Sequence, residues 1–254
     1  MTSKTAMLIA VMAALTTFAA KARAESAEAI LKKVDEASFT RSSQLTMSQK
    51  VVTPGGDERT FKMTVYSENG NEKGLTVYTW PKQVTGMKIL SLNDGDDIWT
   101  YFPSSNRTRK LASSARNRKV QGSDFTYDDL ATGKMVKQWQ GTVLGTEKMS
   151  GKTCYKLALK PTAHGPKSYS KTVVWVDKAT YTPVRIDYFD PDGVYLKRLD
   201  IGLYKKVSGV LIPCAYKMTN QEDGGVTMMK ADEKSIKVNL KLDPILFTEA
   251  GLSR

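Results

Sequence analysis

The sequence predicts a mainly β fold: a strongly curved antiparallel sheet, or incomplete barrel, accompanied by few helices. Short segments of alternating apolar and polar residues follow one another along most of the 254 residues. Clusters of Gly, Asn, Asp and Pro, such as residues 54–57 and 93–96, separate these segments and favour tight turns. Since no break in composition divides the chain, we expect a single domain over residues 25–254.

The first 24 residues have the layout of a cleavable secretory signal peptide. Lys4 precedes an apolar run from Ala6 to Ala20, which is short for a helix that crosses a membrane. Ala22 and Ala24 then supply the small residues expected just before a cleavage site at Glu25. A retained N-terminal membrane anchor is the alternative interpretation. Cleavage predicts export of a mature chain that begins at Glu25.

Residues 26–38 are predicted to form an amphipathic helix. Ile30, Leu31 and Val34 recur at the spacing that places side chains on one helical face, and charged residues occupy the other. Ser26 is a suitable N-cap because a serine hydroxyl accepts hydrogen bonds from the free N–H groups of a first helical turn.

The segments after this helix alternate with a period of two, as the strands of an antiparallel sheet do. From Thr60 to Ser67, for example, Phe61, Met63 and Val65 alternate with more polar residues. The predicted strands are 60–67, 75–80, 87–92 and 97–102 in the first half, and 141–148, 153–160, 171–177, 183–189, 195–205, 210–219 and 226–238 in the second.

A long segment from Ser104 to Trp139 interrupts the strands and is basic and partly helical in character. We expect Asp124 to cap a short helix there, with Phe125 on its apolar side and with Asp128 and Asp129 in solvent.

A second interruption, Asp243 to Gly251, has the composition of a short apolar terminal helix. The first helix and the segment after Asp124 are expected to cover the open side of the sheet, because helices must bury their apolar stripes. A sheet covered loosely in this way tends to enclose a cavity.

The chain carries 38 Lys and Arg residues against 26 Asp and Glu residues, a net charge of +12. Such an excess favours anionic partners: nucleic acid, a membrane surface or an acidic ligand. Export and the lack of a nucleic-acid recognition module exclude nucleic acid as the expected partner.

Residues suited to catalysis or metal binding are scarce. His164 is the single histidine, and the two cysteines are too far apart in sequence for a zinc motif. The acidic segments around Asp94 and Asp190 match turns rather than calcium loops. The chain also lacks phosphate-binding glycine motifs and a nucleophile elbow. We therefore predict no enzyme activity, no metal and no cofactor.

Cys154 and Cys214 both fall in predicted strands that are potential neighbours. In an exported protein they can form a disulfide, which would stabilise the fold by about 4 kcal/mol on a chain-entropy estimate. Two buried thiols fit the sequence equally well, so both alternatives stay open.

A basic loop follows the strand at 97–102. One interpretation is a solvated loop paired in part with the acidic residues that follow it, and the other is a mobile flap near the mouth of a ligand site. Its basic residues are Arg107, Arg109, Lys110, Arg116, Arg118 and Lys119.

A set of motifs around this loop resembles the outer-membrane lipoprotein-sorting (LolA-like) family, in its longer, divergent branch. The similarity spans most of residues 25–254. The motifs are Trp99-Thr100-Tyr101-Phe102-Pro103, Arg107-Thr108-Arg109-Lys110, the run Gly122 to Leu130 (GSDFTYDDL), Trp80-Pro81 with Gly86, Asp177 followed by Pro183, and the tail that contains Phe247.

The resemblance implies a half-open antiparallel β-barrel with a helical lid over an apolar cavity, in a periplasmic protein. It also implies a monomeric carrier that binds acyl chains of lipoproteins or lipids and shuttles them from an inner-membrane transporter to an outer-membrane acceptor, with transient contact to the membrane surface. The alternative is a lipid-binding partner of a resistance-nodulation-type transporter that moves a non-protein lipid.

Apolar and aromatic residues spread over the predicted strands are candidates for the wall of this cavity, since Met adapts to irregular shapes and aromatic rings form broad walls. For each residue, a place in an ordinary packed core is the alternative. The candidates are Met63, Val65, Trp80, Trp99, Tyr101, Phe125 and Trp175.

Overall fold

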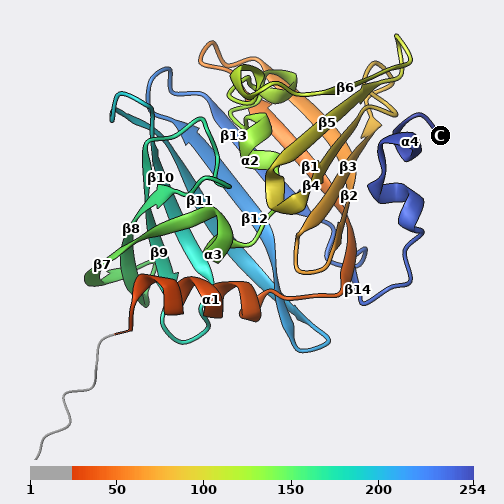
Figure 1. The fold of residues 1–254 in the computed structure, drawn as a ribbon. Coiled ribbons are helices and arrows are strands. Elements are labelled where there is room, and N and C mark those ends of the chain that lie inside the picture. Colours follow the sequence, from red (N-terminus) through yellow and green to blue (C-terminus); the bar gives the residue numbers. More distant parts are fainter. Residues whose placement is uncertain (1–24) are drawn as a thin grey trace, which may run out of the picture.

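The computed structural model describes residues 25–254, and the predicted signal peptide of residues 1–24 lies outside the described residues. The described chain forms one antiparallel sheet that curls strongly without closing into a barrel (Figure 1). Within this part of the chain, the edge strands β6 (Arg107–Lys110) and β7 (Trp139–Met149) each pair on one side only. The predicted fold class, a half-open antiparallel barrel with few helices, is confirmed.

The strands follow the chain in two meanders. The first runs from β1 (Ser42–Val52) to β6, and the second runs from β7 to β13 (Val226–Ala231). The other strands are β2 (Glu58–Glu68), β3 (Lys73–Trp80), β4 (Lys88–Leu92), β5 (Asp97–Phe102), β8 (Lys152–Pro161), β9 (Lys171–Asp177), β10 (Pro183–Phe189), β11 (Tyr195–Val207), β12 (Val210–Asn220) and β14 (Lys237–Val238).

The two meanders join where β1 pairs antiparallel with β13, which places Met47 opposite Ala231. The sequence pattern did not predict β1, because its inward positions include polar residues such as Ser43 and Gln49. The predicted strand 226–238 is broken after β13, and the short β14 pairs separately with β1.

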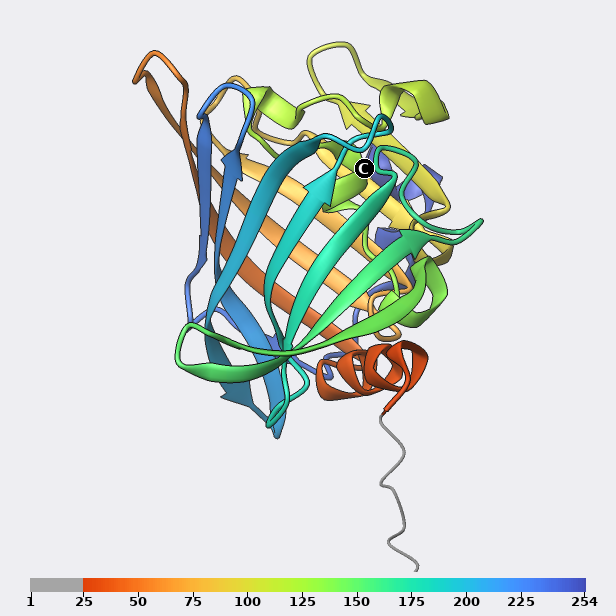
Figure 2. The same ribbon diagram turned by 90° about the vertical axis from the view of Figure 1, so that its left-hand side faces the viewer.

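Helix α1 (Ala27–Ala37) lies across one end of the curled sheet (Figure 2). The Ser26 hydroxyl accepts a hydrogen bond from the Ala29 N–H at 3.1 Å, which confirms the predicted N-cap. The helix also positions α3 (Met135–Gln138), because the Asp35 carboxylate accepts hydrogen bonds from the N–H groups of Met135 (2.7 Å) and Val136 (3.0 Å).

Helix α2 (Tyr127–Leu130) lies on the concave side of the sheet, the side that also faces α1 and α3 (Figure 1). Its N-cap is Thr126, whose hydroxyl and backbone N–H form a capping box with Asp129. The prediction that Asp124 caps this helix is wrong, because the Asp124 carboxylate instead accepts hydrogen bonds from Thr227 (2.9 Å) and Lys119 (3.0 Å).

The C-terminal segment covers the convex face of the sheet rather than the cavity side. Its 3₁₀ helix η4 (Pro244–Phe247) and helix α4 (Glu249–Leu252) confirm the predicted terminal helical segment. Phe247 and Leu252 pack there against Leu75 and Leu90. Three further 3₁₀ turns lie in the connections: η1 (Asn93–Gly95), η2 (Ser113–Ala115) and η3 (Val120–Gly122).

Candidate ligand cavity

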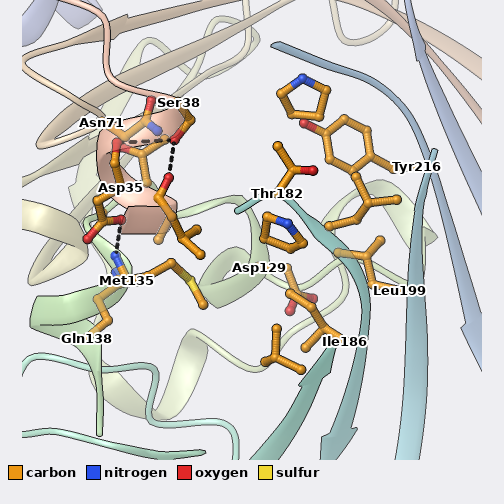
Figure 3. Close-up of a pocket in the computed structure, with 18 of the residues that line it drawn as sticks. Asp35, Ser38, Asn71, Asp129, Met135, Gln138, Thr182, Ile186, Leu199 and Tyr216 are labelled. Carbon is orange, nitrogen blue, oxygen red and sulfur yellow. Dashed lines mark hydrogen bonds between the residues drawn. The ribbon is translucent and has the colours of Figure 1, made fainter. Parts of the chain in front are cut away.

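A cavity of about 390 Å³ lies between the concave face of the sheet and the helices that cover it. Figure 3 shows Ile186, Leu199 and Tyr216 of the sheet on one side and Met135 of α3 with helix α1 on the other. Its volume falls within the range of roughly 300–1,000 Å³ found for small-molecule sites. Most of the wall is carbon, and it includes Val34, Leu45, Met47, Val65, Val174, Ile201 and Ile212.

A second pocket of about 190 Å³ lies next to the first, lined by Met63, Phe125 and Met229. Both pockets share the residues Val65, Asp129, Ala131, Thr132 and Leu199, among others. The segment that carries α2 therefore forms part of the wall of both pockets, and its position sets how the enclosed space is divided.

Three of the seven predicted wall residues line these pockets. Val65 contacts both of them, and Met63 and Phe125 line the smaller one. Met63 and Val65 lie two apart on β2 and therefore share its concave face. These three residues lie together in the wall of the two pockets.

The other four candidates lie outside the cavity, and their assignment needs correction. Trp99 and Tyr101 of β5 point to the convex face and pack under the C-terminal segment. The alternate residues Ile98 and Thr100 take the concave positions of this strand. Trp175 of β9 packs on the convex face with Cys154. Trp80, at the end of β3, is 48% exposed.

Every carboxylate on the cavity wall is already engaged by protein groups. Asp35 caps α3, as described above. Asp128 accepts hydrogen bonds from Arg116 Nε (2.7 Å) and from the hydroxyl of Ser168 (2.5 Å). Asp128 is therefore buried, contrary to the expectation that it stays in solvent, because Arg116 compensates its charge in the interior.

Asp129 forms a second buried ion pair, with Lys197 of β11. The two side chains are 3% and 4% exposed, so the expectation of a solvent-exposed Asp129 is also wrong. The Lys197 ammonium donates a further hydrogen bond to the Asp124 carbonyl (3.0 Å) and lies 5.4 Å from the centre of the Tyr169 ring. These contacts fix the α2 segment to the concave face of β11.

Burial and the negative charge of Asp129 raise the pKa values of two cavity tyrosines, Tyr169 and Tyr188. The Tyr169 hydroxyl donates to Asp129 Oδ1 at 2.5 Å. Both phenols are therefore neutral hydrogen-bonding groups at physiological pH.

Lys197 is not among the site residues predicted from the sequence, although the sequence contains one signal for it. Lys197 lies two and four positions before Leu199 and Ile201, and all three share the concave face of β11. A lysine at an apolar strand position indicates a buried partner, which here comes from α2.

The basic loop divides into a buried and an exposed part. Arg116 is buried and also donates to the carbonyl oxygens of Gly95 (2.5 Å) and Asp96 (3.3 Å), so it fixes the loop and faces no ligand mouth. Both lysines form ion pairs: Lys110 with Asp97, and Lys119 with the buried Asp124 and the exposed Asp223. The remaining cations are exposed: Arg107 and Arg109 lie on the edge strand β6 instead of in the predicted loop, and Arg118 lies in the connection that follows.

Cys154 and Cys214 are buried free thiols. The strands that carry them, β8 and β12, are separated by β9, β10 and β11 in the sheet. Cys154 packs on the convex face, whereas Cys214 belongs to the main core, so the two sulfurs lie on opposite faces. The sequence left open a disulfide or two buried thiols, and the structure contains two buried thiols.

Within residues 25–254, no group of three or more His, Cys, Asp or Glu side chains is arranged to hold a metal ion. The helices described for this part of the chain are also all too short or too polar to cross a membrane.

With this geometry in place, comparison with known proteins identifies the family. A family model described as "Uncharacterized protein"-like matches residues 70–254. The chain belongs to this family. No curated protein sequence matches the chain.

Solved structures confirm the resemblance to outer-membrane lipoprotein-sorting proteins that the sequence shows. A domain named for outer-membrane lipoprotein sorting, from Vibrio parahaemolyticus, is 27% identical with a TM-score of 0.81, and the match covers 89% of this chain and 98% of that one. A DUF1329 family protein from Desulfovibrio piger is 23% identical with a TM-score of 0.81, covering 89% and 97%. A LolA superfamily protein from Nitrosomonas europaea is 23% identical with a TM-score of 0.73, covering 89% and 98%, so both share the fold.

Proposed function

We propose that this LolA-like protein is a periplasmic carrier that holds an acyl chain of a lipoprotein or lipid in its cavity and moves it between the inner and outer membranes. The observation that supports this most strongly is the apolar space of about 390 Å³ under the α1, α2 and α3 segments. The named relative from Vibrio parahaemolyticus supports lipoprotein or lipid cargo in the same fold.

The energetics of transfer suit a carrier without a chemical step. Burial of a chain of about 16 carbons stabilises the bound state by roughly 12 kcal/mol, at about 0.8 kcal/mol for each CH₂ group. A bilayer offers a comparable gain, so exchange between the two is close to balance. An inner-membrane transporter can then load the carrier, and an outer-membrane acceptor with a better site can unload it.

The exposed part of the basic loop supports a transient contact with membrane surfaces. Arg107, Arg109 and Arg118 are exposed, and cations near a membrane attract anionic head groups by about 1 kcal/mol each. A contact of this strength is reversible, as a shuttle requires.

The test is to purify the protein under mild conditions from a cell that produces and exports it, and to identify bound molecules by native mass spectrometry. Copurifying lipidated protein supports the lipoprotein carrier, whereas copurifying free lipid supports the alternative of a lipid-binding partner for a resistance-nodulation-type transporter. Protein that is repeatedly empty and that also fails to bind a fluorescent acyl probe contradicts both.

A matched pair of variants connects binding to the cavity. Ile186→Trp places an indole in the cavity and is expected to abolish acyl-probe binding. Val194→Trp places the same group in an exposed turn and is expected to bind like the unmodified protein. Equal binding by both variants would place the acyl site elsewhere.

A further inference from the structure

Two hydroxyls on the cavity wall, those of Thr172 and Thr132, have no hydrogen-bond partner in the described part of the chain. Thr172 is the one that lies on the strands of the sheet. Thr172 of β9 is 0% exposed, and its Oγ1 is unpaired. It lies two positions before Val174 and four before Val176, which both belong to the concave core, so Thr172 shares their face. It is one of the residues that line the larger cavity.

An unpaired buried hydroxyl lowers the stability of the empty protein, because the group loses its water and gains nothing in return. Valine has nearly the same shape and would fill this place without that loss. Buried polar groups in native proteins are almost always paired, so Thr172 points to a partner that arrives with the ligand.

The surroundings of Thr172 favour a neutral ligand group. Tyr188 lies directly opposite on β10 and lines the same cavity, and the ring of Tyr169 is 4.7 Å from that of Tyr188. This part of the wall is therefore built from a hydroxyl and two phenols.

A charged ligand group would find no free counterion on this wall. The carboxylates Asp35, Asp128 and Asp129 already bind backbone N–H groups, Arg116 and Lys197. A charge buried without a partner is far more costly than a buried neutral dipole. An alkyl chain alone, in turn, would leave the Thr172 hydroxyl unpaired.

We propose that the Thr172 hydroxyl donates a hydrogen bond to the carbonyl oxygen of a neutral acyl ester or amide held in the cavity. This inference rests on the proposed carrier function and names the ligand class: a hydrocarbon chain that enters the cavity together with its neutral acyl linkage. Thr172 thus selects acylated molecules over plain hydrocarbons.

The experiment compares three uncharged ligands of matched length: dodecane, methyl undecanoate and N-methylundecanamide. Each is titrated against a neutral fluorescent dye, N-phenyl-1-naphthylamine, bound to the protein. Thr172→Val is expected to weaken ester and amide binding by about fivefold, the effect of one neutral hydrogen bond, and to leave dodecane binding unchanged. Thr64→Val, on the convex side of β2 next to the inward-facing Met63 and Val65, is the matched control and is expected to change none of the three affinities.

The outcomes separate this inference from the carrier function. If all three ligands bind and Thr172→Val does not alter the preference for ester or amide over alkane, the inference is overturned while the carrier function stands. If none of the ligands displaces the dye from the unmodified protein, the carrier function itself fails. A loss for ester alone indicates an O-acyl source, and a loss for amide alone indicates an N-acyl source.

Two further measurements keep the result interpretable. Empty Thr172→Val protein is expected to unfold at a higher urea concentration than the unmodified protein, because the unpaired hydroxyl is gone. Thr172→Ser, which retains the hydroxyl, is expected to retain the preference for ester and amide over alkane. A serine variant that loses this preference contradicts the proposal.

Discussion

The buried pair of Lys197 and Asp129 gives the sharpest prediction about the α2 segment. Lys197→Met keeps the length of the side chain but removes its charge, so Asp129 stays buried with only Thr126 and Tyr169 to stabilise it. Removal of one partner from a buried ion pair costs about 3–5 kcal/mol. Since the side chains of both partners are less than 5% exposed, we expect the full cost in this protein.

The assay is urea unfolding at pH 7, followed by tryptophan fluorescence, with the midpoint and slope compared between variants. Lys206→Met, at an exposed position of the same strand, serves as the control and is expected to change stability by less than about 0.5 kcal/mol. The double variant Lys197→Met with Asp129→Asn is expected to recover most of the loss, because a neutral amide needs no counterion and can still form hydrogen bonds with Thr126 and Tyr169. A loss below about 1 kcal/mol for Lys197→Met, or a double variant no more stable than the single one, would refute the argument that this pair fixes α2.

Three other predictions concern separate parts of the molecule. Hydrogen bonds from Lys33 and Tyr155 lower the pKa of Glu25 from 4.5 to about 2. The ionised Glu25 therefore stabilises the folded protein above pH 4.5, and this contribution is lost as the pH falls towards 2. Glu25→Gln should lower the melting temperature at pH 7 but not below pH 2, and a decrease that is the same at both pH values contradicts this. Cys154 and Cys214 should both resist a thiol reagent in the folded protein and both react after unfolding without reductant, whereas a count of zero would reveal a disulfide. Phe247→Ala should destabilise the protein by about 3–5 kcal/mol and make the C-terminal segment susceptible to limited proteolysis, because Phe247 packs this segment against the sheet. An unchanged digestion pattern would show that Phe247 does not fix the segment to the sheet.

The sequence predicted most strands because alternation with a period of two survives wherever one face is buried and the other is wet. It could not predict the face in β5, because the convex side of this strand is also partly buried, under the C-terminal segment. Ile98 and Trp99 are both apolar, so the pattern alone does not tell which of them faces the cavity.

The charged residues of the site were harder to predict for a related reason. Asp129 and Lys197 are separated by 68 residues, and each alone has the character of a surface residue. Only the fold brings them together, since α2 lies over β11 on the concave side. By contrast, the N-cap at Ser26 was predictable because its partner, Ala29, is three residues away.

The seam between β1 and β13 has a consequence for how the protein folds. It pairs residues 47–52 with residues 226–231, so the two meanders cannot join until nearly the whole chain has been synthesised. Contacts between such distant residues slow folding, because a long loop must close before any contact forms. The first 24 residues of the chain are predicted to direct export. Slow pairing of β1 with β13 extends the time during which the polypeptide stays unfolded and can pass through a translocation pore.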